Sequence, residues 1–409
     1  MMRSLYSAVT GIRAHQTRMD VIGNNVANVN TIGYKAGRVN FQDILYQTLS
    51  LGAPPSNVRG GVNPEQIGLG VAVGSIDSLM TPGPMQITNV PTDLAINGEG
   101  FFVVSPDISG ATQYFTRAGN FITDRDGNLV LRSNGMHLLG WVADPSGAIN
   151  TNTQPVGLQI VQGQQMPPKA TDKITLSRNL DANTAAGGTV DRLITVYDQL
   201  GGQHTLRLTF TRGTGTPPPN AWAVTATLDG NALTPSPGTM NFNADGTANT
   251  TTLTVSGLPA VFPANITLDV SNLTQYAAET AIDAEQNGYV KGDLSSWAIS
   301  PGGVITATYT NGISRPIAQI ALASFSNPAG LSRLGQTLFR QTPNSGSPQI
   351  GPSNTGGRGE VTPNGLEGSN VDLSNEFTDM IVTQRGFQAN SRVVTTSDEM
   401  LQELVNLKR

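Results

Sequence analysis

The chain has 409 residues, no cysteine and a formal net charge of −5. A chain of this length is too long for one hydrophobic core, so we expect two or three domains. The acidic balance argues against a nucleic acid partner, and the lack of cysteine excludes disulfides and thiolate metal sites. The 46 glycines and 25 prolines, with only 13% charged residues, favour short strands and turns over helices.

The sequence carries no signal for cleavage or membrane insertion. The first twenty residues lack the apolar run and the cleavage site of a secretory signal peptide. No stretch reaches the roughly 18 consecutive apolar residues of a membrane span. We therefore predict a chain without a cleaved signal peptide and without membrane insertion.

Residues 1–32 are predicted to form an amphipathic helix that pairs with the end of the chain. Apolar residues recur at every seventh position, which places them along one side of a helix; they are Leu5, Ile12, Met19 and Val26. Asparagine and glycine in residues 28–33 favour left-handed backbone conformations, so we expect the helix to end near Asn28.

Residues 33–67 are predicted to be a linker segment. Its part from 39 to 51 reads as a short helix or mixed segment, because four apolar residues fall on one side of it: Phe41, Ile44, Leu45 and Leu49. The stretch that follows, to about Pro64, is rich in glycine, proline and asparagine, which is typical of a flexible connection.

Residues 68–146 and 286–366 are predicted to form the two parts of a core β domain. Short apolar runs alternate with turns that contain glycine. Two of these turns predict hairpins, and they are Asn97-Gly98 and Asp126-Gly127.

Residues 147–285 differ in composition and are predicted to form an outer β domain, a sandwich or barrel, inserted into the first. Apolar residues alternate along two runs, as expected for antiparallel strands with one buried face; they are Leu206, Leu208 and Phe210, then Trp222, Val224, Ala226 and Leu228. The predicted fold class is mainly β, with terminal α-helices that form a coiled coil.

Residues 367–409 are predicted to contain the second helix of this coiled coil. A series of apolar residues again recurs every seven positions: Leu373, Met380, Phe387, Val394 and Leu401. Asp372 or Ser374 is expected to cap the start of the helix. With the four residues of the first helix, these five form the predicted assembly seam.

No catalytic, cofactor-binding or metal site is predicted. The loop at Asp124 has the composition of a calcium loop, but its glycine comes too early and Gly135 stands where a glutamate ligand is required. The histidines, His15, His137 and His204, lie in separate segments without ligand spacing, and no nucleophile elbow or phosphate-binding loop occurs. Carboxylates that folding brings together would escape this search, so a secreted β-rich enzyme or adhesin is a remote alternative.

Two stretches resemble the terminal signatures of the bacterial flagellar rod and hook proteins. Residues 24–35 read Asn-Asn-Val-Ala-Asn-Val-Asn-Thr-Ile-Gly-Tyr-Lys and are similar to the N-terminal signature, while residues 368–373 and 380–390 are similar to the C-terminal one. Residues 93–96 and the run that follows Tyr114 resemble the core β domain of this family. A further stretch, 196–204, resembles a motif of hook subunits. Rod proteins of the family generally lack an insertion as large as 147–285, which favours a hook subunit over a rod subunit.

The resemblance implies a structural subunit and no enzymatic activity. The terminal helices, residues 1–32 and 370–409, would line the central channel of a homopolymer, a flexible curved tube that acts as a universal joint and carries motor torque from rod to filament. Implied partners are the adjacent axial proteins (distal rod, hook cap and hook–filament junction) and the flagellar type III export apparatus, which delivers the chain to the extracellular hook. A distal rod subunit of the basal body is the nearer alternative.

Overall fold

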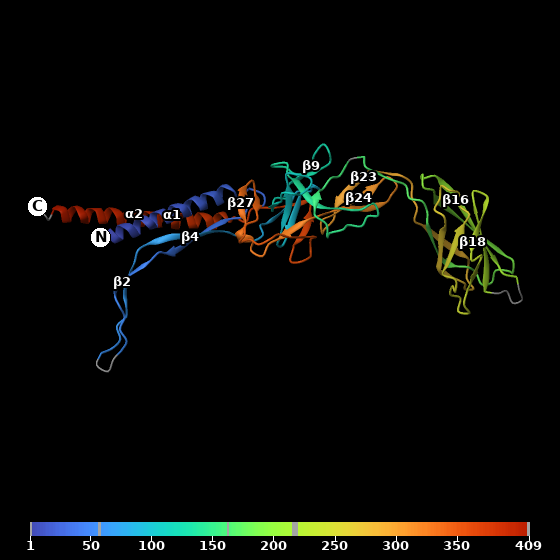
Figure 1. The fold of residues 1–409 in the computed structure, drawn as a ribbon, viewed down its shortest axis with the longest axis horizontal. Helices are drawn as coiled ribbons and strands as arrows, with labels where there is room; N and C mark the ends of the chain where they lie inside the picture. Colours follow the sequence, from blue (N-terminus) through green and yellow to red (C-terminus); the bar gives the residue numbers. More distant parts are fainter. Residues whose placement is uncertain (1, 56–58, 162, 215–219, 407–409) are drawn as a thin grey trace. The chain divides into compact units, whose positions relative to one another are not determined.

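The computed structural model describes residues 2–55, 59–161, 163–214 and 220–406. The chain divides into two compact units, whose elements are drawn in Figure 1. Unit 1 comprises Met1–Val161, Ala298–Thr306 and Pro316–Arg409, and unit 2 comprises Gln162–Trp297 and Ala307–Arg315. The predicted domain limits at 32, 67, 146, 285 and 366 stay predictions.

The first and last elements of unit 1 are two long helices, α1 (Met2–Ala27) and α2 (Leu373–Asn406). They lie side by side and antiparallel (Figure 1), with Arg18 Nη2 of α1 3.1 Å from Asp379 Oδ1 of α2. The Asp372 carboxylate accepts the Ser374 N–H at 2.9 Å and so caps α2. The predicted pair of terminal helices is confirmed. Neither described helix combines the length with the apolar run that crossing a membrane requires.

A ribbon made of two successive pairs of antiparallel strands follows α1. Strand β1 (Gly37–Asp43) pairs with β4 (Val71–Ser78), and β2 (Tyr46–Ser50) pairs with β3 (Glu65–Gly68). The helix considered for residues 39–51 is therefore wrong. The apolar spacing in that stretch does not reveal that β4 and β3 offer backbone hydrogen-bond partners from later in the chain. We call these four strands the ribbon.

The β core of unit 1 is assembled from strands of both halves of the chain. Strands β7, β8, β11, β26 and β28 surround a buried cluster with three edge-to-face phenylalanine contacts that involve Phe101, Phe115, Phe325 and Phe339. The strands of this core are β5 (Met85–Ile87), β6 (Leu94–Asn97), β7 (Phe101–Ser105), β8 (Tyr114–Thr116), β9 (Phe121–Thr123), β10 (Leu129–Leu131), β11 (His137–Val142), β12 (Val156–Gly157), β26 (Leu322–Ser324), β27 (Ser332–Gly335), β28 (Leu338–Arg340), β29 (Gln349–Gly351), β30 (Glu360–Pro363) and β31 (Gly365–Glu367), with one 3-10 turn, Pro328–Gly330.

The two hairpins predicted for this core have different outcomes. The turn at Asp126-Gly127 joins β9 to β10, which pair antiparallel, so that prediction is confirmed. The hairpin predicted at Asn97-Gly98 is wrong, because β6 pairs with β30 and β7 pairs with β8, β11 and β26. Gly98 and Gly100 have φ of +107° and +123°, which favour glycine, so the chain does turn here. The turn leads from β6, which pairs with β30, to β7, which pairs with other strands.

Unit 2 contains a nearly closed barrel. Its strand order is β15-β16-β17-β18-β20-β21-β14-β22, and the end strands β15 and β22 are neighbours, while β14 and β21 run parallel. Its strands are β14 (Lys173–Asn179), β15 (Thr189–Tyr197), β16 (Gln203–Arg212), β17 (Ala221–Leu228), β18 (Asn231–Ser236), β19 (Thr239–Asn241), β20 (Thr252–Ser256), β21 (Ile266–Thr274) and β22 (Ala281–Gln286), and unit 2 also holds β13 (Gln165–Met166). Strands β23 (Gly292–Ile299), β24 (Val304–Tyr309) and β25 (Ser314–Ile320) contribute residues to both units.

The barrel core confirms the alternation read from the sequence. Leu206, Leu208 and Phe210 of β16 are fully buried, and so is Trp222 of β17. Strands β16 and β17 pair antiparallel, which brings Phe210 opposite Val224. The predicted fold class, mainly β with terminal helices, is confirmed.

Candidate functional site

The candidate site is the contact between α1 and α2, together with the junction that joins this helix pair to the β core. The helices touch through small side chains. A Cβ added at Gly11 would lie 2.8 Å from Asn390 Oδ1, and one added at Gly386 would lie 2.6 Å from His15 Cε1. Ala8 and Ala14 of α1, each three residues from Gly11, are also buried. The helix axes therefore approach closely, because the distance between packed helices follows the size of the side chains between them.

The contact face of α2 is a polar series that the sequence analysis missed. Thr383 and Ser397 are buried, and Asn390 lies between them against Gly11. These three residues are spaced by seven, as are the apolar residues of the predicted seam. The two series lie on different sides of α2, and the prediction used the apolar one. The sequence signal for this face is the seven-residue spacing of Thr383, Asn390 and Ser397, of which Asn390 lies against Gly11.

The predicted assembly seam lies beside this contact. None of its nine members is buried, and they fall into two groups. Seven are half-buried at the edges of the helix pair: Leu5, Ile12, Met19, Val26, Met380, Val394 and Leu401. The other two, Leu373 and Phe387, are 39% and 40% exposed. The role of the seam in assembly stays a prediction.

A buried asparagine fixes the end of α1 to α2 and to the ribbon. The Asn25 amide donates to Glu376 Oε1 at 2.9 Å and to the Gly37 carbonyl at 2.8 Å, and it accepts the Gly37 N–H at 2.9 Å. Burial raises the pKa of Glu376. Asn25 thus uses both ends of its amide to connect three segments.

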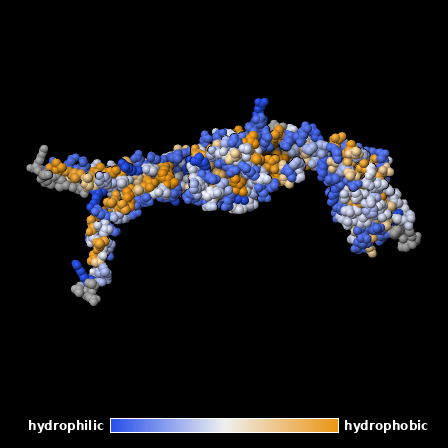
Figure 2. All heavy atoms as spheres, viewed as in Figure 1, coloured by the Kyte–Doolittle hydropathy of each residue, from blue (hydrophilic) through white to orange (hydrophobic). Residues whose placement is uncertain are grey.

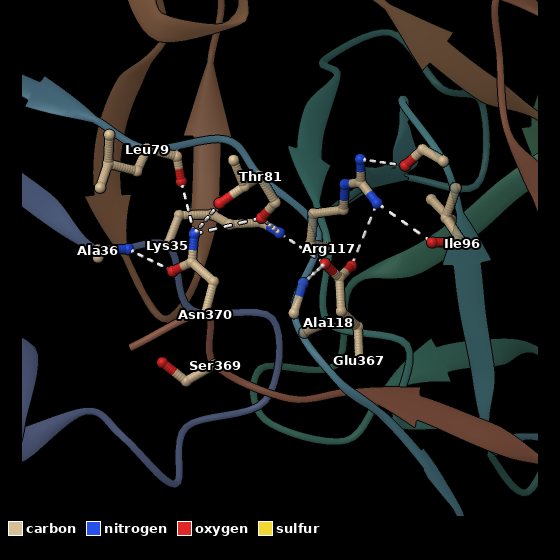
Figure 3. Close-up of polar contacts among 12 residues, drawn as sticks. Lys35, Ala36, Leu79, Thr81, Ile96, Arg117, Ala118, Glu367, Ser369 and Asn370 are labelled. Carbon is tan, nitrogen blue, oxygen red and sulfur yellow. Dashed lines mark hydrogen bonds and ion pairs between the residues drawn. The ribbon is translucent and has the colours of Figure 1, made fainter. Parts of the chain in front are cut away.

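The junction below the helix pair contains three buried charges (Figure 3). The Glu367 carboxylate lies between two cations, with Oε1 2.5 Å from Lys35 Nζ and Oε2 3.2 Å from Arg117 Nη1. No more than 3% of any of these side chains is exposed. Burial lowers the pKa of Lys35 and of Arg117, and the Glu367 carboxylate opposes both shifts. Both cations also donate to backbone carbonyls, Lys35 to Thr81 O at 2.8 Å and Arg117 to Gly98 O at 2.7 Å. Arg117 Nε is buried and has no hydrogen-bond partner among the described residues.

Asn370 ties the same junction together three residues after Glu367. Its side-chain oxygen accepts the Ala36 N–H at 2.7 Å, and its NH₂ group donates to Leu79 O at 2.9 Å and to Thr81 O at 3.2 Å (Figure 3). Lys35 follows α1 closely, and Glu367 and Asn370 come just before α2. The junction therefore forms only when both ends of the chain are folded against the β core.

Outside the helix pair and the junction, the polar groups noted in the sequence lie in turns and ion pairs. Among the described residues, no group of three or more His, Cys, Asp or Glu side chains is placed to hold a metal ion. The Asp124 loop is a turn, as predicted, because its carboxylate accepts the N–H groups of Asp126 at 3.0 Å and Asn128 at 2.7 Å. His204 Nδ1 and Nε2 lie 2.6 Å from Asp229 and 3.4 Å from Asp198, on different sides of the ring.

The helices and the ribbon expose many apolar side chains to water. Figure 2 shows hydrophobic residues gathered over this part of unit 1. Monomeric soluble proteins rarely expose so many apolar side chains in one region, so this surface is an expected interaction site. At least 37% of each of these side chains is exposed: Met2, Tyr6, Val9, Phe41, Ile44, Leu45, Tyr46, Leu49, Leu51, Val62, Ile67, Ile76, Leu373, Phe377, Ile381, Val382, Phe387, Val393, Met400 and Val405.

Four family descriptions match successive parts of the chain. They are "Flagella basal body rod protein" over residues 5–35, "Flagellar hook protein FlgE/F/G D1 domain" over 95–179, "Flagellar basal body protein FlaE D2 domain" over 165–289 and "Flagellar basal body rod FlgEFG protein C-terminal" over 363–407. The first covers most of α1, the last covers all of α2, and the third covers the barrel.

Relatives match over the whole chain. The chain is 41% identical to Flagellar hook protein FlgE of Borreliella burgdorferi and 40% identical to that of Treponema pallidum, with both partners covered in full. It is 30% identical to Flagellar basal-body rod protein FlgG of Bacillus subtilis, again over 100% of both chains. The crystal structure of Helicobacter pylori flagellar hook protein FlgE2 has a similar fold, with a TM-score of 0.53 at 15% identity over 69% of this chain and 98% of that chain.

Proposed function

The chain belongs to the flagellar hook protein family, and from this premise we propose that it is the structural subunit of a hook. Copies of the chain would assemble into a flexible curved tube that transmits motor torque from rod to filament. The observation that carries the proposal is the full-length identity of 41% and 40% with hook proteins, against 30% with a rod protein. The paired terminal helices support it, because their exposed apolar sides need partners that the monomer lacks.

The division of labour we propose follows the predicted domains. Residues 1–32 and 370–409 would form the inner layer of the tube, with the nine-residue seam among its contacts between subunits. The segment 33–67 would connect this layer to the core β domain, residues 68–146 and 286–366. The inserted domain, 147–285, would lie at larger radius. The barrel has a buried hydrophobic core of its own, which supports an outer position. A domain that is stable by itself can tolerate contacts with its neighbours that change as a tube bends.

The proposed partners are neighbouring copies and the axial proteins that adjoin a hook: distal rod, hook cap and hook–filament junction. We propose export through the flagellar type III apparatus and an extracellular place in the flagellum. A chain without cysteine passes unfolded through a narrow channel with no disulfide to obstruct it. Load would be carried by packing and by the buried junction, with no bond made or broken.

Polymerisation of the purified chain, followed by electron microscopy, tests the proposal. Curved tubes are expected, whereas straight tubes would favour the second candidate, a distal rod subunit. Ile12→Asp should block assembly, because it introduces a charge at the half-buried edge of the helix pair. Thr225→Asp is the matched control: it adds the same charge at an exposed position of the barrel, and tubes should still form. Failure of the unaltered chain to form any tube would contradict the proposal.

The role of the barrel is tested by its removal. Lys169 and Tyr289 exchange two backbone hydrogen bonds of 3.0 Å, so a short Gly/Ser turn between them can replace residues 170–288 and the barrel strands β14–β22. Tubes that form but are straight are expected. Loss of all polymer, with helix content and the β core of unit 1 retained, would mean that the barrel supplies essential assembly contacts.

A further inference from the structure

Helix α2 has two apolar flanks on opposite sides. Successive residues of an α-helix are about 100° apart, so Val382, nine residues after Leu373, points about 180° away from it. We call the side of Leu373, Phe377 and Phe387 the knob flank, where the two phenylalanines are 51% and 40% exposed. The opposite flank carries Val382, Val393 and Met400, which are exposed to a similar extent.

A hollow lies on the second flank, where α1, α2 and the ribbon meet. It has a volume of about 310 Å³ and is lined by residues that include Ser7, Gly11, His15, Phe41, Gly70 and Asn390. Val382 is one turn from Gly386, whose backbone lies against the His15 ring, and Val393 is one turn from Asn390. Val393 therefore lies one helical turn from the hollow, on the side of α2 that also carries Val382.

The lining of the hollow suits an aromatic side chain. Small residues leave room, and the Phe41 ring meets the His15 ring edge to face at 5.5 Å, which sets an aromatic wall on one side. His15 Nδ1 is buried and has no hydrogen-bond partner among the described residues. An aromatic ring pushed into this space would gain edge-to-face contacts and exclude water.

We propose that the hollow of one copy receives the knob flank of α2 from a second copy, with Phe387 as the inserted side chain. This inference deepens the proposed function and rests on it. The knob and the hollow lie on opposite sides of one helix, so the contact is heterologous: each copy offers a knob to one neighbour and a hollow to another. Such a contact does not close on itself as a dimer, and it adds copies without limit, as a tube requires.

The second copy fits better than any internal segment. In one chain the antiparallel helices place Gly11 opposite Asn390, so Ser7 and Phe387 are about 10 Å apart along the helix axes at 1.5 Å per residue. Phe387 of the same chain therefore does not reach the Ser7 side of the hollow. The two flanks also leave apolar surface exposed on both sides of α2, and a side-by-side contact repeated from copy to copy covers both.

Engineered disulfides test the inference, since the chain has no cysteine of its own. The double variant Ser7→Cys with Phe387→Cys is assembled into tubes, oxidised, dissolved in denaturant and run on a gel without reductant. A ladder of covalent dimers, trimers and longer oligomers is expected. A disulfide within one chain is excluded, because bridged Cα atoms lie about 4.4–6.8 Å apart.

The single variants and their mixture give the controls. Each single variant should stay monomeric on the gel, and tubes mixed from the two singles should give dimers only. If Phe387→Cys prevents assembly, Gln384→Cys places the thiol on the same flank and keeps the aromatic ring. Tubes of either double variant that stay monomeric after oxidation would overturn the inference, as would dimers from Phe387→Cys alone. Absence of tubes in the unaltered chain would count against the proposed function instead.

Discussion

The barrel of unit 2 and the helix pair of unit 1 use their apolar residues in opposite ways. The barrel buries a continuous cluster that includes Trp222, Phe210 and Leu208, and its end strands meet so that few edges are left. The helix pair buries mainly small side chains, among them Ala8, Ala14, Thr383 and Ser397. Apart from the buried Ile22, it leaves its large apolar side chains half-buried or exposed. The barrel thus covers its apolar residues within the monomer, whereas the helix pair leaves apolar surface that the proposed assembly would cover.

Because of this difference, the apolar residues of the barrel should determine the stability of a domain, and those of the helix pair should determine assembly. A sealed core stabilises its own domain, at about 25 cal/mol for each Å² of apolar surface removed from water. An exposed apolar flank does not stabilise the monomer in this way. Its surface contributes a favourable free energy only when a partner removes it from water. Mutations should therefore affect the two regions through different measurements, and the following predictions use that contrast.

The largest effect is expected at the junction that carries the helix pair. Glu367→Ala leaves Lys35 and Arg117 buried with no counter-charge, and losing one partner of a buried ion pair costs about 3–5 kcal/mol. Chemical denaturation should show an early transition in unit 1, while the transition of the barrel is unchanged. Glu403→Ala, on the exposed surface of α2, is the control and should change neither transition. Equal behaviour of the two variants would contradict a structural role for the buried charges.

A matched pair of leucines compares the two uses of apolar side chains. Leu208→Ala opens a cavity in the barrel core and should lower its free energy of unfolding by about 2–5 kcal/mol. Leu373→Ala removes a side chain that is 39% exposed and should change monomer stability by about 0.5 kcal/mol. The order should reverse in assembly, measured as the critical concentration for polymerisation: Leu373→Ala raises it and Leu208→Ala does not. A critical concentration unchanged by Leu373→Ala would remove this residue from the interface.

The parts of the structure that sequence predicts well are those set by local pattern. The alternation of Leu206, Leu208 and Phe210 has the period of a strand, and the barrel buries these residues as predicted. The helices were likewise found from seven-residue spacing. The hairpin at Asn97-Gly98 was wrong because β6 pairs with β30, more than 260 residues later, and no local signal carries that pairing.

Only part of the candidate site could be predicted from the sequence, for a related reason. Apolar spacing identified the helices but not the face between them, because Thr383, Asn390 and Ser397 are polar and pack by their small size. Lys35 and Glu367 are 332 residues apart, and nothing in either segment indicates that their charges meet in a buried junction. Of the four junction residues, Lys35 and Asn370 lie in the terminal signatures, whereas Arg117 and Glu367 do not, and the signatures carry no information on these contacts.

Two glycines of the helices sharpen the account of the close contact. An alanine methyl at Gly386 would overlap the His15 ring, and overpacking of this kind costs about 1–3 kcal/mol. Gly23 of α1 has nothing within 4 Å of an added Cβ, so Gly23→Ala should stabilise its helix by about 0.5–1 kcal/mol. Thermal melting followed by circular dichroism at 222 nm should show the helix signal lost earlier in Gly386→Ala and later in Gly23→Ala. A gain in both would mean that the helices do not pack as closely as described.

The smallest effect is expected from pH, and it has opposite signs in the two regions. Hydrogen bonds that His204 donates to the carboxylates of Asp229 and Asp198 raise the pKa of His204 in the barrel above 6.5. Burial, assisted by Arg18, lowers the pKa of His15 in the helix pair below 6.5. His204 binds its proton more tightly in the folded state, so its contribution is complete below pH 6.5 and is lost as pH rises through the folded pKa. His15 binds its proton less tightly in the folded state, so its contribution is complete above pH 6.5 and is lost as pH falls through the folded pKa.

Both shifts are measurable in one experiment, because the chain has only three histidines. In a nuclear magnetic resonance titration, the ring protons of His204 should titrate above pH 6.5 and those of His15 below it, with His204→Asn and His15→Asn identifying the two signals. Unfolding at several pH values should then show the barrel weakening toward alkaline pH and the helix pair weakening toward acid. His15 is packed against Gly386 and Phe41 only while α1, α2 and the ribbon are together. A His15 signal that titrates at 6.5 in the folded chain would therefore mean that this three-way contact is open in the monomer and that the helix pair closes only on assembly.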